Sequence, residues 1–93
     1  ISKDMMEQFM GKGISSDGLD AKTRLLLTLQ GLTMHGAQAE AQIRLTVRHL
    51  VAAGATKQEI AETIGLAAMF GGVPAMTKAM ELANDVLDKD ASQ

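Results

Sequence analysis

The chain has 93 residues, of which 46% are hydrophobic and two are aromatic, and its formal net charge is −2. It contains no cysteine, which excludes disulfides, thiolate nucleophiles and sulfur-ligated zinc within these residues. Acidic and basic residues are interspersed and aromatic residues are scarce, so there is neither a basic stripe nor a stacking platform for nucleic acid. We expect no nucleic-acid partner.

The length predicts a single domain over residues 1–93, with its core in residues 19–88. So high an apolar fraction is difficult to bury in a small monomer, which favours oligomerisation. No apolar run reaches the roughly 18–20 residues that span a bilayer. The N-terminal segment "ISKDMMEQFM" lacks the pattern of a signal peptide. We therefore expect a cytoplasmic protein with no membrane contact.

The first predicted element is a short amphipathic helix over residues 1–11. Its apolar face consists of Met5, Met6, Phe9 and Met10, which lie on one side of a helix with 3.6 residues per turn. The following segment, "GKGISSDG", is rich in glycine and serine and indicates a loop.

Two helices are predicted next. Asp20 is a good N-cap for a helix with the sequence "AKTRLLLTLQGLTM", and its inward stripe comprises Leu25, Leu29 and Leu32, with Leu26 beside them. A further helix is expected from about residue 38 to 53, with an inward stripe of Ile43, Val47, Leu50 and Val51. Gly54 then supplies a left-handed stop.

The last two helices have clear start signals. Thr56 and Glu59 form a capping box that opens the helix "KQEIAETIGLAAMF". The glycine pair at 71–72 breaks it, and Pro74 lies in the first turn of a fifth helix, where proline is tolerated. That helix has an inward stripe of Met76, Met80, Ala83 and Leu87. With no strand candidate, the prediction is an all-α bundle of about five helices.

The segment Ile64–Phe70 is apolar or small on every side of its helix. A helix that is hydrophobic all round must be covered all round, and short neighbouring helices cannot easily do this in so small a domain. We interpret the segment as the buried spine of an oligomer, with a monomeric core as the alternative. Its methionines are interpreted as adaptable packing material, with a methionine-lined ligand pocket as the alternative.

Two segments and one arginine resemble a known family. "LDAKTR" at residues 19–24, "AAGATKQEIAETIGLAAMFGGVPAM" at residues 52–76 and Arg48 occur in an order similar to that of the carboxymuconolactone decarboxylase family, which includes the alkylhydroperoxidase D-like proteins. The resemblance extends from about Leu19 to Leu87. It implies a small helical bundle of the alkylhydroperoxidase D-like type, assembled as a homo-oligomer, either a trimer or a hexamer.

Redox members of this family carry a glutamate upstream of a CxxCxxxH motif. Counting back from Gly54 places the two cysteine positions at Ala39 and Gln42 and the histidine position at Thr46. Counting forward from "KTR" instead gives a glutamate position at Leu25 and the other three at Ala37, Glu40 and Arg44. Under either count, the cysteines, the histidine and the glutamate of the redox members are absent. Thiol peroxidase chemistry is therefore excluded, and only membership of the family would suggest that activity.

The decarboxylase branch resembles the rest of the family in a histidine that falls here on Thr46. Arg44 and Arg48, four residues apart, are candidates to bind a small carboxylate, with His49 or His35 as the catalytic acid. The alternatives are structural. Arg44 can form an ion pair with Glu40 within the helix, His49 can be a half-buried structural residue, and His35 can cap helix carbonyls.

No cofactor and no metal are expected, since two histidines without an acidic partner at helical spacing do not make a metal site. The glycine pair at 71–72 lacks the residues of a phosphate-binding loop. The function predicted from sequence is therefore an oligomeric, non-redox carboxymuconolactone decarboxylase-like protein without the catalytic set. The alternative is a lyase or isomerase that acts on a small carboxylate or lactone.

Overall fold

The structure, a computed structural model, describes residues 18–91, and every regular element in that range is a helix. The helices are α2 (Ala21–Met34), α3 (Glu40–Ala52), α4 (Lys57–Gly71) and α5 (Val73–Ala91). The predicted all-α class is confirmed. The helix expected over residues 1–11 lies outside the described residues.

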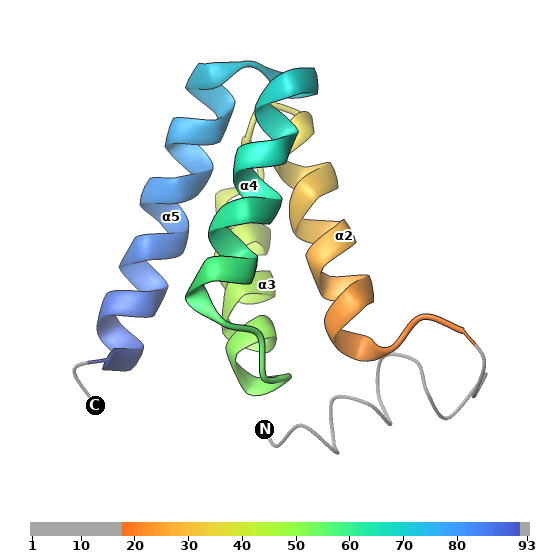
Figure 1. Cartoon of the computed structure of the whole chain (residues 1–93). Coiled ribbons are helices and arrows are strands. Elements are labelled where there is room, and N and C mark those ends of the chain that lie inside the picture. Colours follow the sequence, from red (N-terminus) through yellow and green to blue (C-terminus); the bar gives the residue numbers. More distant parts are fainter. Residues whose placement is uncertain (1–17, 92–93) are drawn as a thin grey trace.

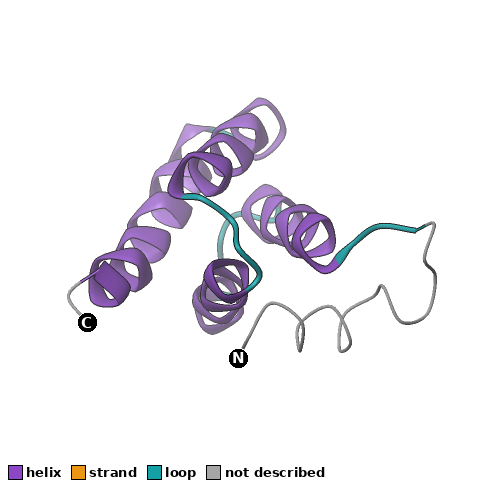
Figure 2. Cartoon of the chain, turned by 60° about the horizontal axis from the view of Figure 1, so that its bottom comes forward, coloured by secondary structure: helices purple, strands orange, loops and turns teal. Residues whose placement is uncertain are grey.

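The helices alternate in direction along the bundle (Figure 1). α2 contacts α3, α4 and α5, while α5 also contacts α3 and α4. Figure 2, which brings the lower end of the bundle forward, shows the helices as separate columns joined by short loops. This up-and-down arrangement lets each helix bury its apolar stripe against neighbours. Among the helices of residues 18–91, none is both long enough and apolar enough to pass through a membrane.

Side-chain caps fix where two of the helices begin. The Asp20 carboxylate accepts a hydrogen bond of 2.8 Å from the backbone N–H of Thr23 at the start of α2. At the start of α4, the Thr56 hydroxyl accepts from the Glu59 N–H at 3.0 Å and a Glu59 carboxylate oxygen accepts from the Thr56 N–H at 2.9 Å. The predicted N-cap and capping box are confirmed, and each satisfies N–H groups that have no partner within the helix.

α3 begins at Glu40, about two residues later than predicted, and no side chain caps it. The preceding loop contains Gly36 (φ 97°) and Ala37 (φ 56°), which both adopt the left-handed region. Ala39 then has φ −83° and ψ 73°, outside the helical region, and the Glu40 N–H donates to the Gln38 carbonyl at 3.0 Å in a tight turn, so the helix starts only at Glu40. Gly54 (φ 90°) terminates the same helix with a positive φ, as predicted.

The core lies where the inward stripes converge. The two central stripe residues of α2, Leu25 and Leu29, are buried, and so are most of the predicted stripe of α3 and half of that of α5. The other predicted members are half-buried and pack around the core; they are Leu26, Leu32, Val51, Met76 and Met80. The predicted stripes therefore identify the inward side of each helix.

The glycine pair between α4 and α5 has two separate roles. A β-carbon on Gly71 would lie 3.0 Å from the Cα of Met34 and 3.1 Å from the carbonyl oxygens of Met34 and Thr33. The last turns of α4 and α2 therefore pack backbone against backbone. Gly72 follows with φ 89° and links α4 to α5, which begins at Val73.

Candidate functional site

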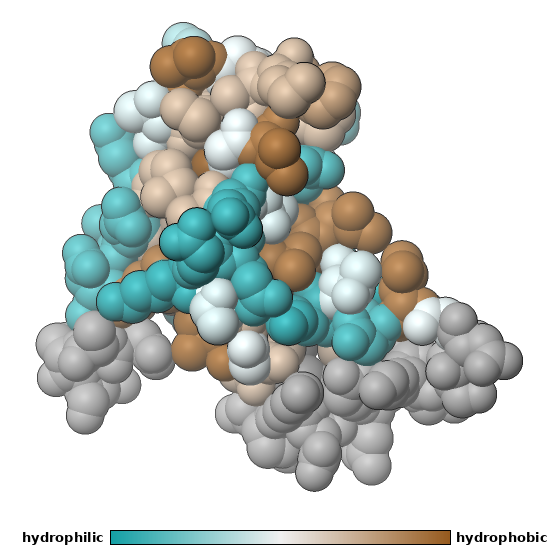
Figure 3. Space-filling view, viewed as in Figure 1, coloured by the Kyte–Doolittle hydropathy of each residue, from teal (hydrophilic) through white to brown (hydrophobic). Residues whose placement is uncertain are grey.

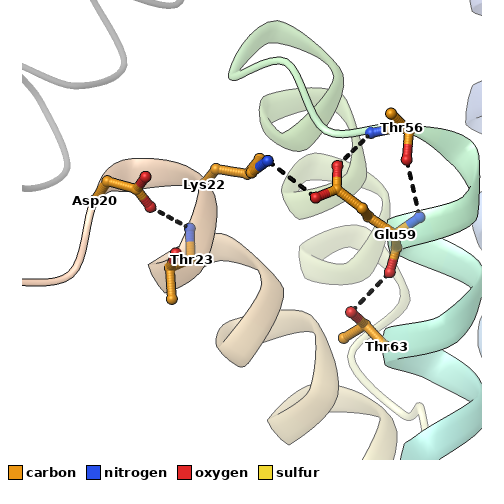
Figure 4. Close-up of polar contacts among 6 residues, drawn as sticks. All are labelled: Asp20, Lys22, Thr23, Thr56, Glu59 and Thr63. Carbon is orange, nitrogen blue, oxygen red and sulfur yellow. Dashed lines mark hydrogen bonds and ion pairs between the residues drawn. The ribbon is translucent and has the colours of Figure 1, made fainter.

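The two sequence segments that define the resemblance meet at the start of α2 and α4 (Figure 4). The Lys22 ammonium group donates a hydrogen bond of 2.9 Å to a carboxylate oxygen of Glu59, and the two side chains are 32% and 35% exposed. The contact joins residues that are 37 positions apart. It ties the beginnings of two helices together at the lower end of the bundle (Figure 1).

Both carboxylate oxygens of Glu59 have protein partners. One accepts from the Thr56 backbone N–H and the other from Lys22. The hydrogen bond from Thr56, followed by that from Lys22, holds the pKa of the Glu59 carboxyl below its ordinary value. The same pairing raises the pKa of the Lys22 ammonium group. Glu59 is thus held as a carboxylate that connects helix ends.

The two arginine candidates lie close to one another on α3. Positions 44 and 48 are separated by about 40° around a helix, so they lie on one side of it. Arg44 is 3.9 Å from a carboxylate oxygen of Asp85 on α5, with side chains 38% and 62% exposed, and Arg48 is exposed. Glu40 pairs with Lys78 of α5 at 3.1 Å. Glu40 and Arg44 therefore both pair with α5 and not with each other.

The histidine candidates do not lie on the side of α3 that carries Arg44 and Arg48, although His49 follows Arg48 directly in the chain. His49 is half-buried in the last turn of α3, and positions 44 and 49 are about 140° apart around that helix. His35 is exposed and follows the last residue of α2, where its backbone N–H donates to the Gly31 carbonyl at 3.1 Å. α2 and α3 end at opposite ends of the bundle (Figure 1). The structure thus brings together Arg44 and Arg48 alone.

Thr46, one of the positions expected for the family's histidine, is 7% exposed. Its hydroxyl donates to the Gln42 carbonyl at 2.7 Å, a bond made within α3. The other buried polar side chain of the described residues is Thr33, which donates in the same way to the Leu29 carbonyl at 2.8 Å. The described part of the interior therefore holds hydroxyls with their own partners and no ionisable side chain.

The other positions at which redox members carry cysteine or glutamate differ in burial and in location. Ala39 is the residue before α3 and Gln42 is exposed in its first turn. By the second count, the glutamate position is Leu25, which is 2% exposed within the apolar core. Neither count brings a set of proton-transfer groups into one place.

The sequence profile of the carboxymuconolactone decarboxylase family matches residues 2–85. This chain belongs to that family. A protein of Paracoccus denitrificans described as an uncharacterized 15.0 kDa protein in the nqo9-nqo10 intergenic region is 59% identical over 86 residues, which cover 92% of this chain. The chain spans 64% of the length of that relative. No solved structure matches this chain.

In this carboxymuconolactone decarboxylase family member, two contacts join α2 to α4, and each includes a residue of the segments that carry the family resemblance. Lys22 and Glu59 join one end of α2 to α4, and Met34 and Gly71 join the other end. Sequence reasoning missed the first contact. A lysine in the first segment and a glutamate in the second were the available signal for this ion pair. The sequence alone does not show that Lys22 and Glu59 lie side by side.

A second feature that the structure adds is an apolar face on the upper half of α4 and the neighbouring α2. On α4 and the start of α5, Leu66, Met69, Phe70 and Val73 are 58%, 78%, 69% and 62% exposed. Leu27 and Met34 of α2 are also exposed, and we call these six residues the apolar face. In Figure 3, hydrophobic surface covers the upper part of α4 and the side of α2, while hydrophilic surface covers the lower part of α4.

Proposed function

We propose that this chain is a non-redox member of the carboxymuconolactone decarboxylase family that serves as a self-assembling helical subunit. Thr46 carries the proposal. A threonine hydroxyl does not titrate near neutral pH, so it cannot replace an imidazole as the proton relay of the redox members. The Thr46 hydroxyl is also buried and donates to the backbone of its own helix.

The apolar face supports the self-assembly part of the proposal. From residue 64 to 70 the sequence predicts a helix that must be covered on all sides, and within one chain Ile64 and Ala67 are buried while Leu66, Met69 and Phe70 remain exposed. The exposed side needs a cover from outside the single bundle. The trimers or hexamers implied by the family resemblance would supply one.

The test combines an assay with a mass measurement. The purified chain is incubated with hydrogen peroxide and with an organic hydroperoxide, each with a dithiol reductant, and peroxide consumption is followed beside a reductant-only control. We expect no consumption beyond the stoichiometric oxidation of methionine. Light scattering at micromolar concentration should give a multiple of the chain mass. Sustained turnover of hydroperoxide would overturn the non-redox part, and a monomer would overturn the subunit part.

A second candidate function, a lyase that acts on a small carboxylate, has one observation in its favour. Arg44 and Arg48 share one side of α3, and the 3.9 Å pair between Arg44 and Asp85 is exposed and therefore readily exchanged for a ligand carboxylate. Decarboxylation of a carboxymuconolactone would be assayed with the native chain and Arg48→Ala, with Lys57→Ala as an exposed cationic control. Turnover that Arg48→Ala alone abolishes would favour this candidate over the first.

A further inference from the structure

We propose that Met69 is a modification site, at which a hydroperoxide oxidises the thioether sulfur to a sulfoxide and thereby releases the subunit from its assembly. The oxidation itself depends only on the exposure of this side chain, whereas the release rests on the proposed self-assembly. Each side chain accepts one oxygen atom and is then spent, so the reaction is stoichiometric and differs from the peroxidase turnover of the redox members.

In a separate subunit, Met69 is the methionine of the described residues that an oxidant in solution reaches most easily. The residue is 78% exposed, more than any other large hydrophobic residue of residues 18–91, and Met34 follows among the methionines at 40%. Met76 and Met80 are half-buried and pack against the core. Oxidation of a sulfur atom follows its access to the oxidant. Among these four methionines, Met69 should therefore react first.

The oxidation transfers one oxygen atom from the peroxide to sulfur. A lone pair on the Sδ atom of Met69 attacks the terminal oxygen of the hydroperoxide, the O–O bond breaks, and an S–O bond forms. The proton of the terminal O–H moves to the departing oxygen, which leaves as an alcohol, or as water when the oxidant is hydrogen peroxide. Sulfur loses two electrons and the peroxide gains them. The thioether is itself the reductant, so no further reductant is needed.

The sulfoxide changes the polarity of the apolar face. Leu66, Met69 and Phe70 follow the spacing i, i+3 and i+4, which places their side chains on one side of α4. None of the six side chains of the apolar face carries a hydrogen-bond donor. The sulfoxide oxygen is a polar acceptor, and water satisfies it in a separate subunit. Under a hydrophobic cover the same oxygen loses its water and finds no donor on this face, which opposes assembly.

Assembly and oxidation at this position therefore oppose one another. A cover over the apolar face keeps peroxide away from Met69, so the sulfur reacts in subunits that have separated. Because the oxidised form returns to the assembly less readily, the effect is reciprocal. The rate of Met69 oxidation should fall as the concentration of the chain rises. Met80 is shielded by the core of its own chain, so its rate should not depend on concentration.

Peptide mapping after exposure to hydrogen peroxide tests the modification site. Each sulfoxide adds about 16 Da, and fragment ions assign it to one methionine. At the lowest concentration of the native chain, we expect Met69 to be oxidised ahead of Met76 and Met80, and its rate should fall several-fold as the concentration is raised. Oxidation of Met69 no faster than that of Met76 and Met80 would overturn the modification site. A rate for Met69 that is the same at every concentration would overturn its link to assembly.

Substitution by leucine separates this sulfur from the others. Met69→Leu keeps an apolar side chain of similar volume but has no thioether, and Met80→Leu is the matched control. The three chains receive the same peroxide exposure, which is stopped when Met69 of the native chain is fully converted, and light scattering then gives their masses. The native chain and Met80→Leu should fall to the mass of a single chain, while Met69→Leu should keep the mass of the assembly. Equal loss of mass in all three chains, or in none, would overturn the release step.

A polar substitution tests the release without an oxidant. Met69→Gln places an uncharged polar group in the apolar face and should give the single-chain mass directly, whereas Thr77→Gln, at an exposed position on α5, should leave the mass unchanged. Circular dichroism of both variants checks that the helices are intact. An unchanged mass for Met69→Gln would overturn the release step and leave self-assembly in place. A native chain that is a monomer before peroxide is added would overturn both self-assembly and release, while the peptide map still decides the modification site.

Discussion

The backbone of Met34 occupies the space into which a side chain on Gly71 would project. The β-carbon of an alanine at position 71 would lie 3.0 Å from the Met34 Cα and 3.1 Å from its carbonyl oxygen. Both are backbone atoms of the last turn of α2, so they cannot rotate away. α2 and α4 approach this closely only because residue 71 has no side chain.

Gly71→Ala should therefore lower the free energy of unfolding by about 1–3 kcal/mol, the usual cost of forcing extra volume into a packed contact. Gly31→Ala is the control, since a β-carbon at Gly31, inside α2, meets nothing within 4 Å. That substitution should raise the free energy of unfolding by about 0.5–1 kcal/mol, because alanine loses less backbone freedom in a helix. Urea unfolding followed by circular dichroism measures both changes in the free energy of unfolding. A change in the same direction for the two variants would contradict a tight contact at Gly71.

Thr56→Ala should lower the free energy of unfolding by about 1 kcal/mol, since it removes the hydroxyl that accepts from the Glu59 N–H at the start of α4. Thr56→Ser retains an acceptor and should recover most of the loss. Thr77→Ala, at an exposed position on α5, should change the stability by less than about 0.5 kcal/mol. Thermal and urea unfolding give the three values. A loss at Thr77 as large as at Thr56 would contradict a specific cap.

The Lys22–Glu59 pair predicts a loss of stability in acid. Hydrogen bonds from Thr56 and Lys22 lower the folded-state pKa of Glu59 from its ordinary value of 4.5. The stabilisation is therefore fully present above pH 4.5 and is lost as the pH falls through the lowered pKa. The native chain should lose more stability than Glu59→Gln between neutral pH and the acid range. Glu81→Gln, at an exposed position on α5, is the control and should follow the native profile.

Lys22 has the opposite dependence at the alkaline end. Its pKa is raised from 10.5, so its contribution is present below pH 10.5 and is lost as the pH rises through the raised value. Lys22→Gln should flatten the alkaline part of the stability profile, as Glu59→Gln should flatten the acid part. Urea unfolding across the pH range reports both. Parallel profiles for the native chain and the two variants would show that the pair does not contribute.

Thr46→Val tests whether the buried hydroxyl has a task beyond its own helix. Valine has a similar shape, and the hydroxyl's acceptor, the Gln42 carbonyl, lies within α3. The expected change in the free energy of unfolding is below about 1 kcal/mol, because the donor is removed together with its need for a partner. Assembly mass should also be unchanged. Loss of a measurable activity in this variant would show that the Thr46 hydroxyl has a task beyond the hydrogen bond within its own helix.

The sequence predicted those parts of the fold that depend on neighbouring residues. The caps at Asp20 and Thr56 fix helix starts within one turn, so their geometry could be anticipated. The start of α3 could not be anticipated, because it depends on the preceding loop, in which Ala37 has a positive φ and Ala39 lies outside the helical region, and alanine signals neither conformation. Local chemistry sets the first kind of boundary and tertiary packing the second.

The candidate site was less predictable, since its contacts join residues that are distant in sequence. Asp85, the partner of Arg44, lies on α5, and the partner of Lys22 is 37 positions away. Only the packing of the helices determines these pairs. The sequence did indicate that residues 64–70 need a cover on all sides, but the division between core and exposed face depends on where α2 and α5 pack against α4.

The two buried threonines, at positions 33 and 46, indicate which interactions hold the helices of this bundle together. Each is bonded to a carbonyl one turn earlier in its own helix, so neither binds one helix to another. The bundle thus derives its cohesion from hydrocarbon contacts, helix caps and surface ion pairs, none of which requires a reactive group in the interior. Substitutions at polar positions of α3 such as Thr46 can therefore leave the packing of the bundle unchanged.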